Sequence, residues 1–420
     1  MTTTHREQRR AILQQFGAGE PATEELLAYL ENHFTVPAAG TIPIPLADER
    51  CVAAWEEYVQ ACDREGGGAA VLRRRLPQLA FPIAEGMSQD AGYRRATREG
   101  RWEPEADEGL EFERPESVTL RLHATPAGRI AVITCHHRAD FVALLRALTR
   151  RNEPEVIPES MGACMVGGFA NWNRIRVLRN AWAATAVDPS ETGWRQAWPA
   201  LSHRKEEYQD RFILLSDGPY SGVRAEVIGV DADTWRDWSL CLRLEHECAH
   251  YFTRRVFGSM RNTLLDELIA DFAGITAVVP TFQARWYLAF LGLERYPAYR
   301  EGGRLQNYRG TPPLSDDAFS VLQALVVAAA GRVERFDQRC AAEEGEPLPA
   351  PAWRNTGADA LHATSTHERS PARRAAAMAA IASWSLEEIA ADGGEARLRE
   401  TYRQWLPVAR AAESSSGSIR

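Results

Sequence analysis

The chain has 420 residues, of which 45% are hydrophobic and 25% charged, enough to bury a large core and to form two or three domains. Its formal net charge of −8 argues against a nucleic-acid partner. The sequence contains no apolar run of the roughly eighteen residues that a membrane span needs, and its N-terminus has no apolar signal core, so neither a membrane nor a secreted protein is expected.

The seven cysteines are odd in number and scattered along the chain. Their spacing matches neither a disulfide framework nor a cysteine-rich zinc site. We therefore expect the protein to work in a reducing compartment, the cytoplasm. Nothing in the composition indicates an oligomeric state.

The first 115 residues are predicted to form a helical N-terminal region. Amphipathic patterns rich in helix-forming residues occur at 7–16, 23–33 and 47–62. Prolines interrupt the connection after the second pattern, and the acidic stretch 101–116 is typical of a linker or a long loop.

A small α/β segment is predicted over residues 116–200. Two strand-like runs, 117–123 and 129–135, are joined by a Pro-Ala-Gly turn and followed by a helical pattern at 139–149. The glycine-rich run 162–174 could let the backbone approach a ligand closely, but a role in turns and packing explains it better.

Residues 201–410 are predicted to form the catalytic domain, and residues 411–420 a disordered tail. Two strand-like runs would form a β-hairpin directly upstream of a long helix, and a polar, proline-containing stretch would separate the later helices. The expected strands are 211–216 and 224–230, the expected later helices are 281–293, 316–333 and 361–385, and the polar stretch is 341–351. The fold class is therefore α+β and mostly helical.

His246, Glu247 and His250 form the most informative pattern in the chain. The apolar residues around them have helical spacing, with Asp233 or Thr234 as the expected N-cap. Two histidines four residues apart share one face of a helix, so both can reach one Zn²⁺ at about 2.0–2.1 Å. The glutamate between them is the candidate general base. Such a pattern arises by chance in roughly one chain in a hundred of this length, so its context decides.

The context is a second apolar-periodic stretch that begins shortly after the histidine helix. Sixteen residues separate His250 from Glu267, a gap that suits a second helix turning back on the first. Glu267 can then approach the metal as a third ligand. Asp271, one helical turn further on, could accept a hydrogen bond from the outer nitrogen of a ligating histidine and fix its orientation.

A His-Glu-x-x-His helix followed by Glu-x-x-x-Asp resembles the gluzincin clan of zinc metallopeptidases. The run from Glu267 to Gly274 also resembles the Glu-x-x-Ala-Asp-x-x-Gly signature of M48-type peptidases, over about forty residues in all. The resemblance implies a zincin-like metallopeptidase domain in which the two histidines and Glu267 bind zinc, Glu247 is the base, and Asp271 supports a ligand. The two motifs are closer together than in the M48 pattern and no transmembrane segment flanks them, so the substrate class does not transfer.

A candidate oxyanion donor lies further downstream. The run Thr364–Arg374 resembles the Ser-Thr-His-Pro segment near the end of many M48-type domains, with Glu368 in place of the proline. Hydrolysis creates an oxyanion that needs a donor besides the metal, and His367 is our candidate. A helix-capping histidine that faces water would explain the same residue. His362 and Tyr251 are weaker candidates.

The sequence therefore predicts a zinc-dependent hydrolase, a metallopeptidase acting on a peptide or protein substrate. A structural zinc site is disfavoured because such sites use four protein ligands rich in cysteine. Two other classes stay open. Non-haem Fe(II) oxygenases also use two histidines and a carboxylate. Alternatively, the large N-terminal portion could belong to a regulatory protein whose zincin domain acts on a single protein partner.

Overall fold

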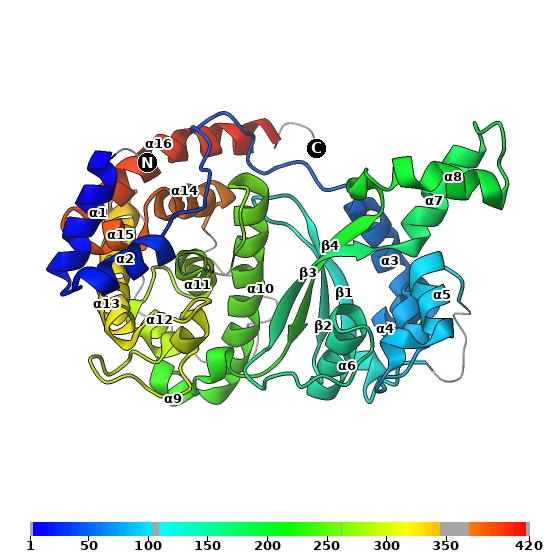
Figure 1. Ribbon diagram of the computed structural model, residues 1–420, viewed down its shortest axis with the longest axis horizontal. Helices are drawn as coiled ribbons and strands as arrows, with labels where there is room; N and C mark the ends of the chain where they lie inside the picture. The colour runs from blue at the N-terminus through cyan, green and yellow to red at the C-terminus, as the bar shows by residue number, and fades with distance from the viewer. Residues whose placement is uncertain (1–2, 103–108, 262, 345–368, 417–420) are drawn as a thin grey trace. The chain divides into compact units, whose positions relative to one another are not determined.

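The computed structural model describes residues 3–102, 109–261, 263–344 and 369–416 (Figure 1). Within these ranges the protein is a mostly helical α+β structure with sixteen α-helices and one four-stranded sheet. The chain divides into two compact units, which we call the helical unit and the sheet unit. The helical unit comprises residues 1–46 and 218–420, and the sheet unit comprises residues 47–217. This division differs from the boundaries after residues 115 and 200 that the sequence suggests.

The N-terminal helices belong to the helical unit because they pack on helices from the far end of the chain. Helix α1, Thr3–Gln15, packs on α15, Leu386–Ala390, and the buried Arg9 side chain forms an ion pair with Glu387. Helix α2, Glu20–Tyr29, packs on α13, Asp316–Glu343. An amphipathic pattern shows that a helix buries one face, but not which distant helix covers that face. The local sequence therefore could not indicate this grouping.

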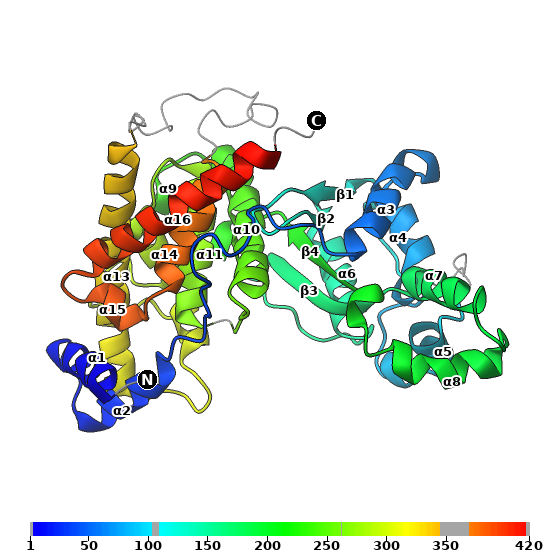
Figure 2. The same ribbon diagram turned by 90° about the horizontal axis from the view of Figure 1, so that it is seen from above.

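The sheet unit is built on four strands in the spatial order β1-β2-β4-β3 (Figure 2). Strands β1 and β2 are antiparallel, β2 and β4 are parallel, and β3 and β4 are antiparallel. The strands are β1, Val118–His123; β2, Ile130–Cys135; β3, Ala163–Ala170; and β4, Gln209–Ser216. The glycine-rich run expected to form turns is largely strand β3, and its register shifts between Gly167 and Phe169.

Six helices belong to the same unit, and two of them contribute large side chains to the core under the sheet. Trp55 and Phe141 pack with Ile133 and Leu214 in one buried cluster. The helices are α3, Cys51–Glu65; α4, Gly68–Arg75; α5, Ala91–Glu99; α6, Arg138–Thr149; α7, Trp172–Ala183; and α8, Glu191–Leu201. The structure thus confirms the helices and strands that the sequence predicts before residue 150.

The predicted β-hairpin upstream of the histidine helix is wrong. Only its first strand forms, as β4, while residues 224–230 contain the short helix α9, Ala225–Ile228. Both edges of β4 are already paired, with β2 on one side and β3 on the other, so no edge is left for a following strand. In this run the buried residues Ala225 and Ile228 lie three positions apart, the spacing of residues on one face of a helix.

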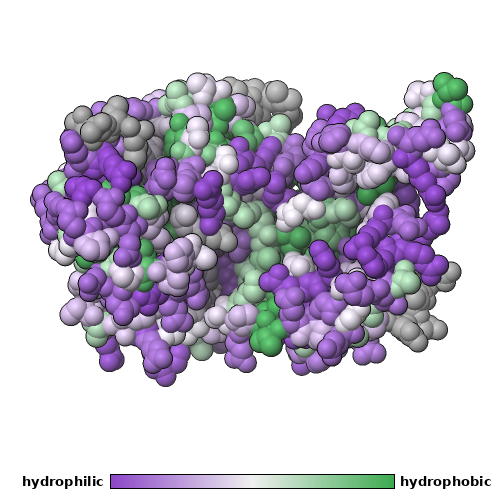
Figure 3. Space-filling model, in the orientation of Figure 1, coloured by the Kyte–Doolittle hydropathy of each residue, from purple (hydrophilic) through white to green (hydrophobic). Residues whose placement is uncertain are grey.

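The helical unit contains the remaining helices. They are α10, Ala232–Val256; α11, Leu264–Val278; α12, Ala284–Leu291; α13, Asp316–Glu343; α14, Pro371–Ala382; and α16, Gly394–Ser416. Helix α16 continues into the tail that the sequence predicts as disordered. Among the described helices, none is both long enough and apolar enough to cross a membrane. The face drawn in Figure 3 is mostly hydrophilic, with smaller hydrophobic areas between.

Candidate metal centre

Helix α10 carries the two motif histidines and starts earlier than predicted. Its N-cap is Asp231, whose carboxylate accepts a hydrogen bond from the backbone N–H of Thr234 at 2.9 Å. The prediction of Asp233 or Thr234 as the cap is therefore wrong. Asp231 and Asp233 are equally good capping residues by type, so the sequence pattern could not choose between them.

Helix α11 supplies the carboxylates. Its N-cap is Thr263, whose hydroxyl accepts a hydrogen bond from the backbone N–H of Asp266 at 3.4 Å. Every residue from Leu264 to Thr276 is buried, as in a helix that lies inside a protein core. Asp266, Glu267 and Asp271 are therefore carboxylates inside the protein, where each needs a charged or hydrogen-bonding partner.

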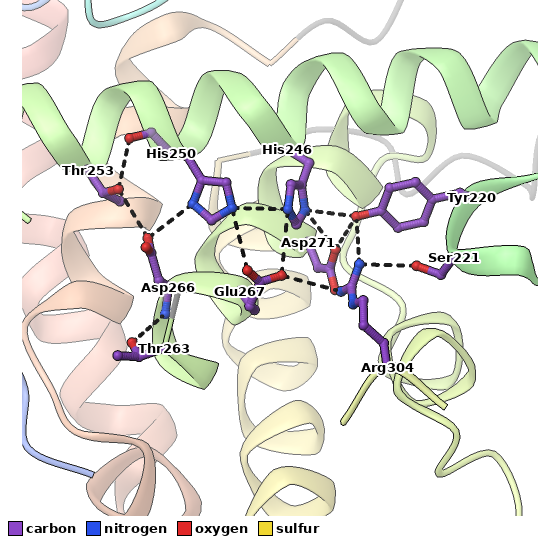
Figure 4. A network of polar contacts seen from close by, with 10 residues as sticks. All are labelled: Tyr220, Ser221, His246, His250, Thr253, Thr263, Asp266, Glu267, Asp271 and Arg304. Atoms are coloured by element: carbon purple, nitrogen blue, oxygen red, sulfur yellow. Dashed lines mark hydrogen bonds and ion pairs between the residues drawn. The ribbon is translucent and has the colours of Figure 1, made fainter. Parts of the chain in front are cut away.

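His246, His250 and Glu267 meet between α10 and α11 (Figure 4). Nε2 of His246 lies 3.1 Å from Nε2 of His250, and each of these nitrogens lies 3.6 Å from an oxygen of the Glu267 carboxylate. The three residues are 8%, 5% and 4% exposed, so each is largely buried and reaches the surface with only a small part of its side chain. Together they could hold a metal ion.

The spacing of the donor atoms fits a small divalent cation. A tetrahedral ion that lies about 2.0–2.1 Å from each donor needs donors about 3.3–3.4 Å apart. The observed separations of 3.1 and 3.6 Å lie on either side of that range. Two imidazoles and one carboxylate are also a donor set that zinc accepts. The side chains present therefore fit a metal ion without a large rearrangement.

The outer nitrogen of His250 faces a carboxylate that the sequence analysis missed. Nδ1 of His250 lies 3.3 Å from Oδ1 of Asp266, which directly precedes Glu267 in α11. The same Asp266 oxygen accepts a hydrogen bond from the hydroxyl of Thr253 at 3.1 Å. Asp266 is therefore held in place from α10 while it faces the ring of His250.

The outer nitrogen of His246 faces Asp271, at the position expected from the sequence. Nδ1 of His246 lies 3.0 Å from Oδ1 of Asp271 and 2.8 Å from the hydroxyl of Tyr220, which itself donates to that Asp271 oxygen at 2.6 Å. A carboxylate only accepts hydrogen bonds, so this arrangement requires the proton of the neutral imidazole on Nδ1. The lone pair of Nε2 then points toward His250 and Glu267.

Arg304 completes the polar network from a third part of the chain. It lies in a 3₁₀ helix, Arg304–Tyr308, between α12 and α13. Its guanidinium donates to Oδ2 of Asp271, to the hydroxyl of Tyr220 at 3.2 Å and to the hydroxyl of Ser221 at 3.1 Å (Figure 4). One nitrogen also lies 3.8 Å from a Glu267 oxygen.

The pKa values of these groups follow from burial and from their charged neighbours. Burial alone would raise the pKa of Asp271, but Arg304 and hydrogen bonds from His246 and Tyr220 hold it below its usual range. Burial and the charge of Asp271 raise the pKa of Tyr220 well above its ordinary value, so the phenol stays protonated. Burial would lower the pKa of His250, but facing carboxylates, first among them Asp266, raise it to about 10.

Of the other residues predicted to belong to the site, Glu247 and Tyr251 lie within the described residues. Glu247 is half-buried on α10, between the two histidines in the sequence, and its charge contributes to the raised pKa of His250. His367, the candidate oxyanion donor, and His362 lie outside the described residues. Tyr251 is completely buried, with its ring beneath the guanidinium of Arg255.

Tyr220, Asp266 and Arg304 are the members of the site that the sequence analysis missed. Asp266 had a usable signal, because two adjacent acidic residues at the start of an otherwise apolar helix would both be buried. Tyr220 and Arg304 had none. They lie in 3₁₀ helices of three and five residues, one before and one after the two motif helices, which are too short for an apolar periodicity to show which way a side chain faces.

Comparison with known proteins places the chain in a family. No curated protein and no solved structure shows significant similarity to it. Residues 11–392 match the family described as "Family of unknown function (DUF7005)". The match spans most of the chain, including α10, α11 and the segment with Arg304. The chain therefore belongs to DUF7005, a family of unknown function.

Proposed function

We propose that this protein is a zinc-dependent hydrolase of the metallopeptidase type, which cleaves a peptide or amide bond. The observation that carries the proposal is the meeting of His246, His250 and Glu267 around one point, with Glu247 on the same helix as the histidines. The resemblance of both motif helices to gluzincin peptidases supports the same reading.

The number of ligands favours a catalytic site over a structural one. Among the histidines, cysteines and carboxylates that the structure describes, three gather around this point: His246, His250 and Glu267. Structural zinc is usually held by four protein ligands, whereas catalytic zinc has three and keeps a position open for water or substrate. When bound, zinc would lower the pKa of a water molecule toward 7 and polarise the carbonyl of the substrate.

Proton transfer and the orientation of the ligands would be performed by side chains of the protein. Glu247 would accept a proton from the attacking water and then donate it to the leaving amine. The side chain of Glu247 is half-buried, which is compatible with contact to the attacking water and to the leaving amine. Asp266 and Asp271 would keep the two imidazoles turned so that Nε2 of each faces the metal.

The test combines metal analysis with peptide hydrolysis by the full chain. We expect about one zinc per chain and cleavage of members of a mixed peptide library, followed by mass spectrometry. Glu247→Gln should keep its zinc and lose about 10²–10⁴-fold in turnover, because the amide keeps the shape of the side chain but cannot act as a base.

Asp233→Asn is a matched control, since it makes the same chemical change on α10 at a side chain that is 83% exposed. It should turn over at the wild-type rate. Full activity of Glu247→Gln would show that hydrolysis does not use this glutamate. Stoichiometric iron with oxygen consumption would instead assign the site to the Fe(II) oxygenases. Zinc binding without cleavage of any library member would favour a regulator specific for one protein partner.

A further inference from the structure

The segment between α12 and α13, residues 292–315, brings a charged side chain to the candidate metal centre. We call it the Arg304 segment. It lies outside both motif helices and follows them in the chain. Arg304 contacts neither ligand histidine and lies 3.8 Å from an oxygen of Glu267, whereas it donates a hydrogen bond directly to Asp271. Asp271, which faces Nδ1 of His246, is therefore its most direct route to a bound metal.

Two glycines lie where the ends of the Arg304 segment meet: Gly292, directly after α12, and Gly303, directly before Arg304. A Cβ atom on Gly303 would lie 2.5 Å from the carbonyl oxygen of Leu291 and 2.7 Å from Cα of Gly292, so the two backbones cross in direct contact. Hydrogen bonds reinforce the crossing: the N–H of Arg300 donates to the carbonyl of Gly292 at 2.8 Å. The backbone position of Arg304 is therefore set by this crossing.

The contacts of Arg304 restrict Asp271 to one orientation. Asp271 is fully buried, and its two oxygens have different partners: Oδ2 accepts from Arg304, while Oδ1 faces Nδ1 of His246. Tyr220 links the two sides, because its hydroxyl accepts from Arg304 and donates to Oδ1. A carboxylate held at both oxygens cannot rotate away from the imidazole.

Arg304 also balances charge. Asp271 and Glu267 are neighbouring buried carboxylates on one face of α11, and the guanidinium lies within ion-pair distance of both. Without a cation, Asp271 would be an uncompensated buried charge beside the metal ligands. The expected response is rotation of the carboxylate or entry of water, and either would release the His246 ring.

We propose that Arg304 is a positioning residue: through Asp271 it fixes the direction of the His246 imidazole and thereby slows release of the metal. The proposal rests on the metal centre of the proposed function. It adds that the Arg304 segment, closed by Gly292 and Gly303, controls retention of the metal without contributing a ligand.

A double-mutant cycle with zinc release as its readout tests the proposal. Full-length protein is loaded with Zn²⁺, and the release rate is followed with a chromogenic chelator. Arg304→Gln and Asp271→Asn should each accelerate release, by about 10–100-fold, the range for loss of a residue that supports a metal ligand. If Arg304 acts through Asp271, the double variant should release zinc no faster than Asp271→Asn alone. Additive acceleration, or wild-type release from Arg304→Gln, would overturn the proposal.

Two controls separate positioning from general damage. Arg300→Gln removes an arginine of the same segment whose side chain binds Glu294 and the carbonyl of Ala289, and it should leave zinc release unchanged. Absorption of the Co²⁺-loaded proteins reports ligand geometry directly. The spectrum of Arg304→Gln should change in the same direction as that of Asp271→Asn, and that of Arg300→Gln should not change.

Should Arg304→Gln fail to fold, Tyr220→Phe replaces it in the cycle. Phenylalanine keeps the ring packed edge-on against Phe290, at 4.8 Å between centroids, and removes the hydroxyl that accepts from Arg304, donates to Asp271 and lies 2.8 Å from Nδ1 of His246. Wild-type zinc release from Tyr220→Phe would overturn the proposal. Because release and Co²⁺ absorption need no turnover, a positive cycle in a protein without hydrolytic activity would contradict only the proposed function. A negative cycle in an active zinc enzyme would contradict only the role of Arg304.

Discussion

Gly274 of α11 lies directly against the carbonyl oxygen of Leu242 in α10, and a Cβ atom at Gly274 would come within 2.8 Å of that oxygen. The two motif helices therefore touch backbone to backbone one turn beyond Asp271. Only glycine allows this approach without displacing one of the helices. The glycine of the Glu-x-x-Ala-Asp-x-x-Gly pattern thus has a packing role in this protein.

Gly274→Ala should therefore destabilise the protein and weaken metal binding together. The added methyl group must push α11 away from α10, which typically costs about 1–3 kcal/mol. Thermal unfolding of the metal-free protein measures the first effect, and zinc titration measures the second.

Gly331→Ala in α13 is the control for that prediction. Its Cβ would meet only the flexible end of Arg335, at 3.4 Å, so the substitution should be neutral or slightly stabilising. Equal loss of stability in the two variants would show that the contact between Gly274 and Leu242 is not the cause.

Removal of any one predicted ligand should abolish tight zinc binding. His246→Ala, His250→Ala and Glu267→Ala each leave two protein donors, too few to hold the ion against a chelator. Metal content after dialysis is the measurement. Full zinc occupancy in any of the three variants would remove that residue from the ligand set.

Asp266→Asn should have a milder effect than Glu267→Ala, although the two residues are adjacent. It weakens the interaction with Nδ1 of His250 and the hydrogen bond from Thr253 but removes no predicted ligand, so zinc should bind at saturating concentration but with affinity lowered about 10–100-fold. A competition titration of both variants beside wild type checks the order. If Asp266→Asn lost zinc first, Asp266 rather than Glu267 would be the third ligand.

Zinc binding should release a proton near neutral pH. In the metal-free protein, carboxylates outweigh burial and raise the pKa of His250 from 6.5 to about 10. His250 is then protonated at pH 7, and its proton must leave before Nε2 can bind metal. The proton from His250 should contribute about one proton per zinc at pH 7–8 and nothing above about pH 10, in addition to the proton that zinc-bound water loses near pH 7. The difference in proton release between pH 8 and pH above 10 therefore isolates the contribution of His250.

The same shift predicts how the stability of the metal-free protein depends on pH. Because the folded pKa of His250 lies above the unfolded value, the stabilisation is complete below pH 6.5 and is lost as the pH rises through about 10. Denaturant unfolding of the metal-free protein across this range is the measurement. The His250→Ala variant should lack this component of the pH dependence.

The sequence by itself determined the parts of the site that lie within one helix. The spacing of His246 and His250 requires that they share a face, because four residues span about one helical turn. Glu267 and Asp271 have the same four-residue spacing on α11. The connection between α10 and α11 is short, so these two helices can pack against each other in only a few ways. Periodicity and short connections are local properties, so they can be read without knowing the fold.

Only the tertiary structure decided which distant segments complete the site. Residues 224–230 have an apolar pattern compatible with a strand, yet they form helix α9 because β2 and β3 already occupy both edges of β4. Arg304 reaches Asp271 from a short 3₁₀ helix, 33 residues away in the chain. The ion pair between Arg9 and Glu387 joins helices near opposite ends of the chain. Burial of charge selects such partners by their proximity in space, which a local sequence pattern does not encode.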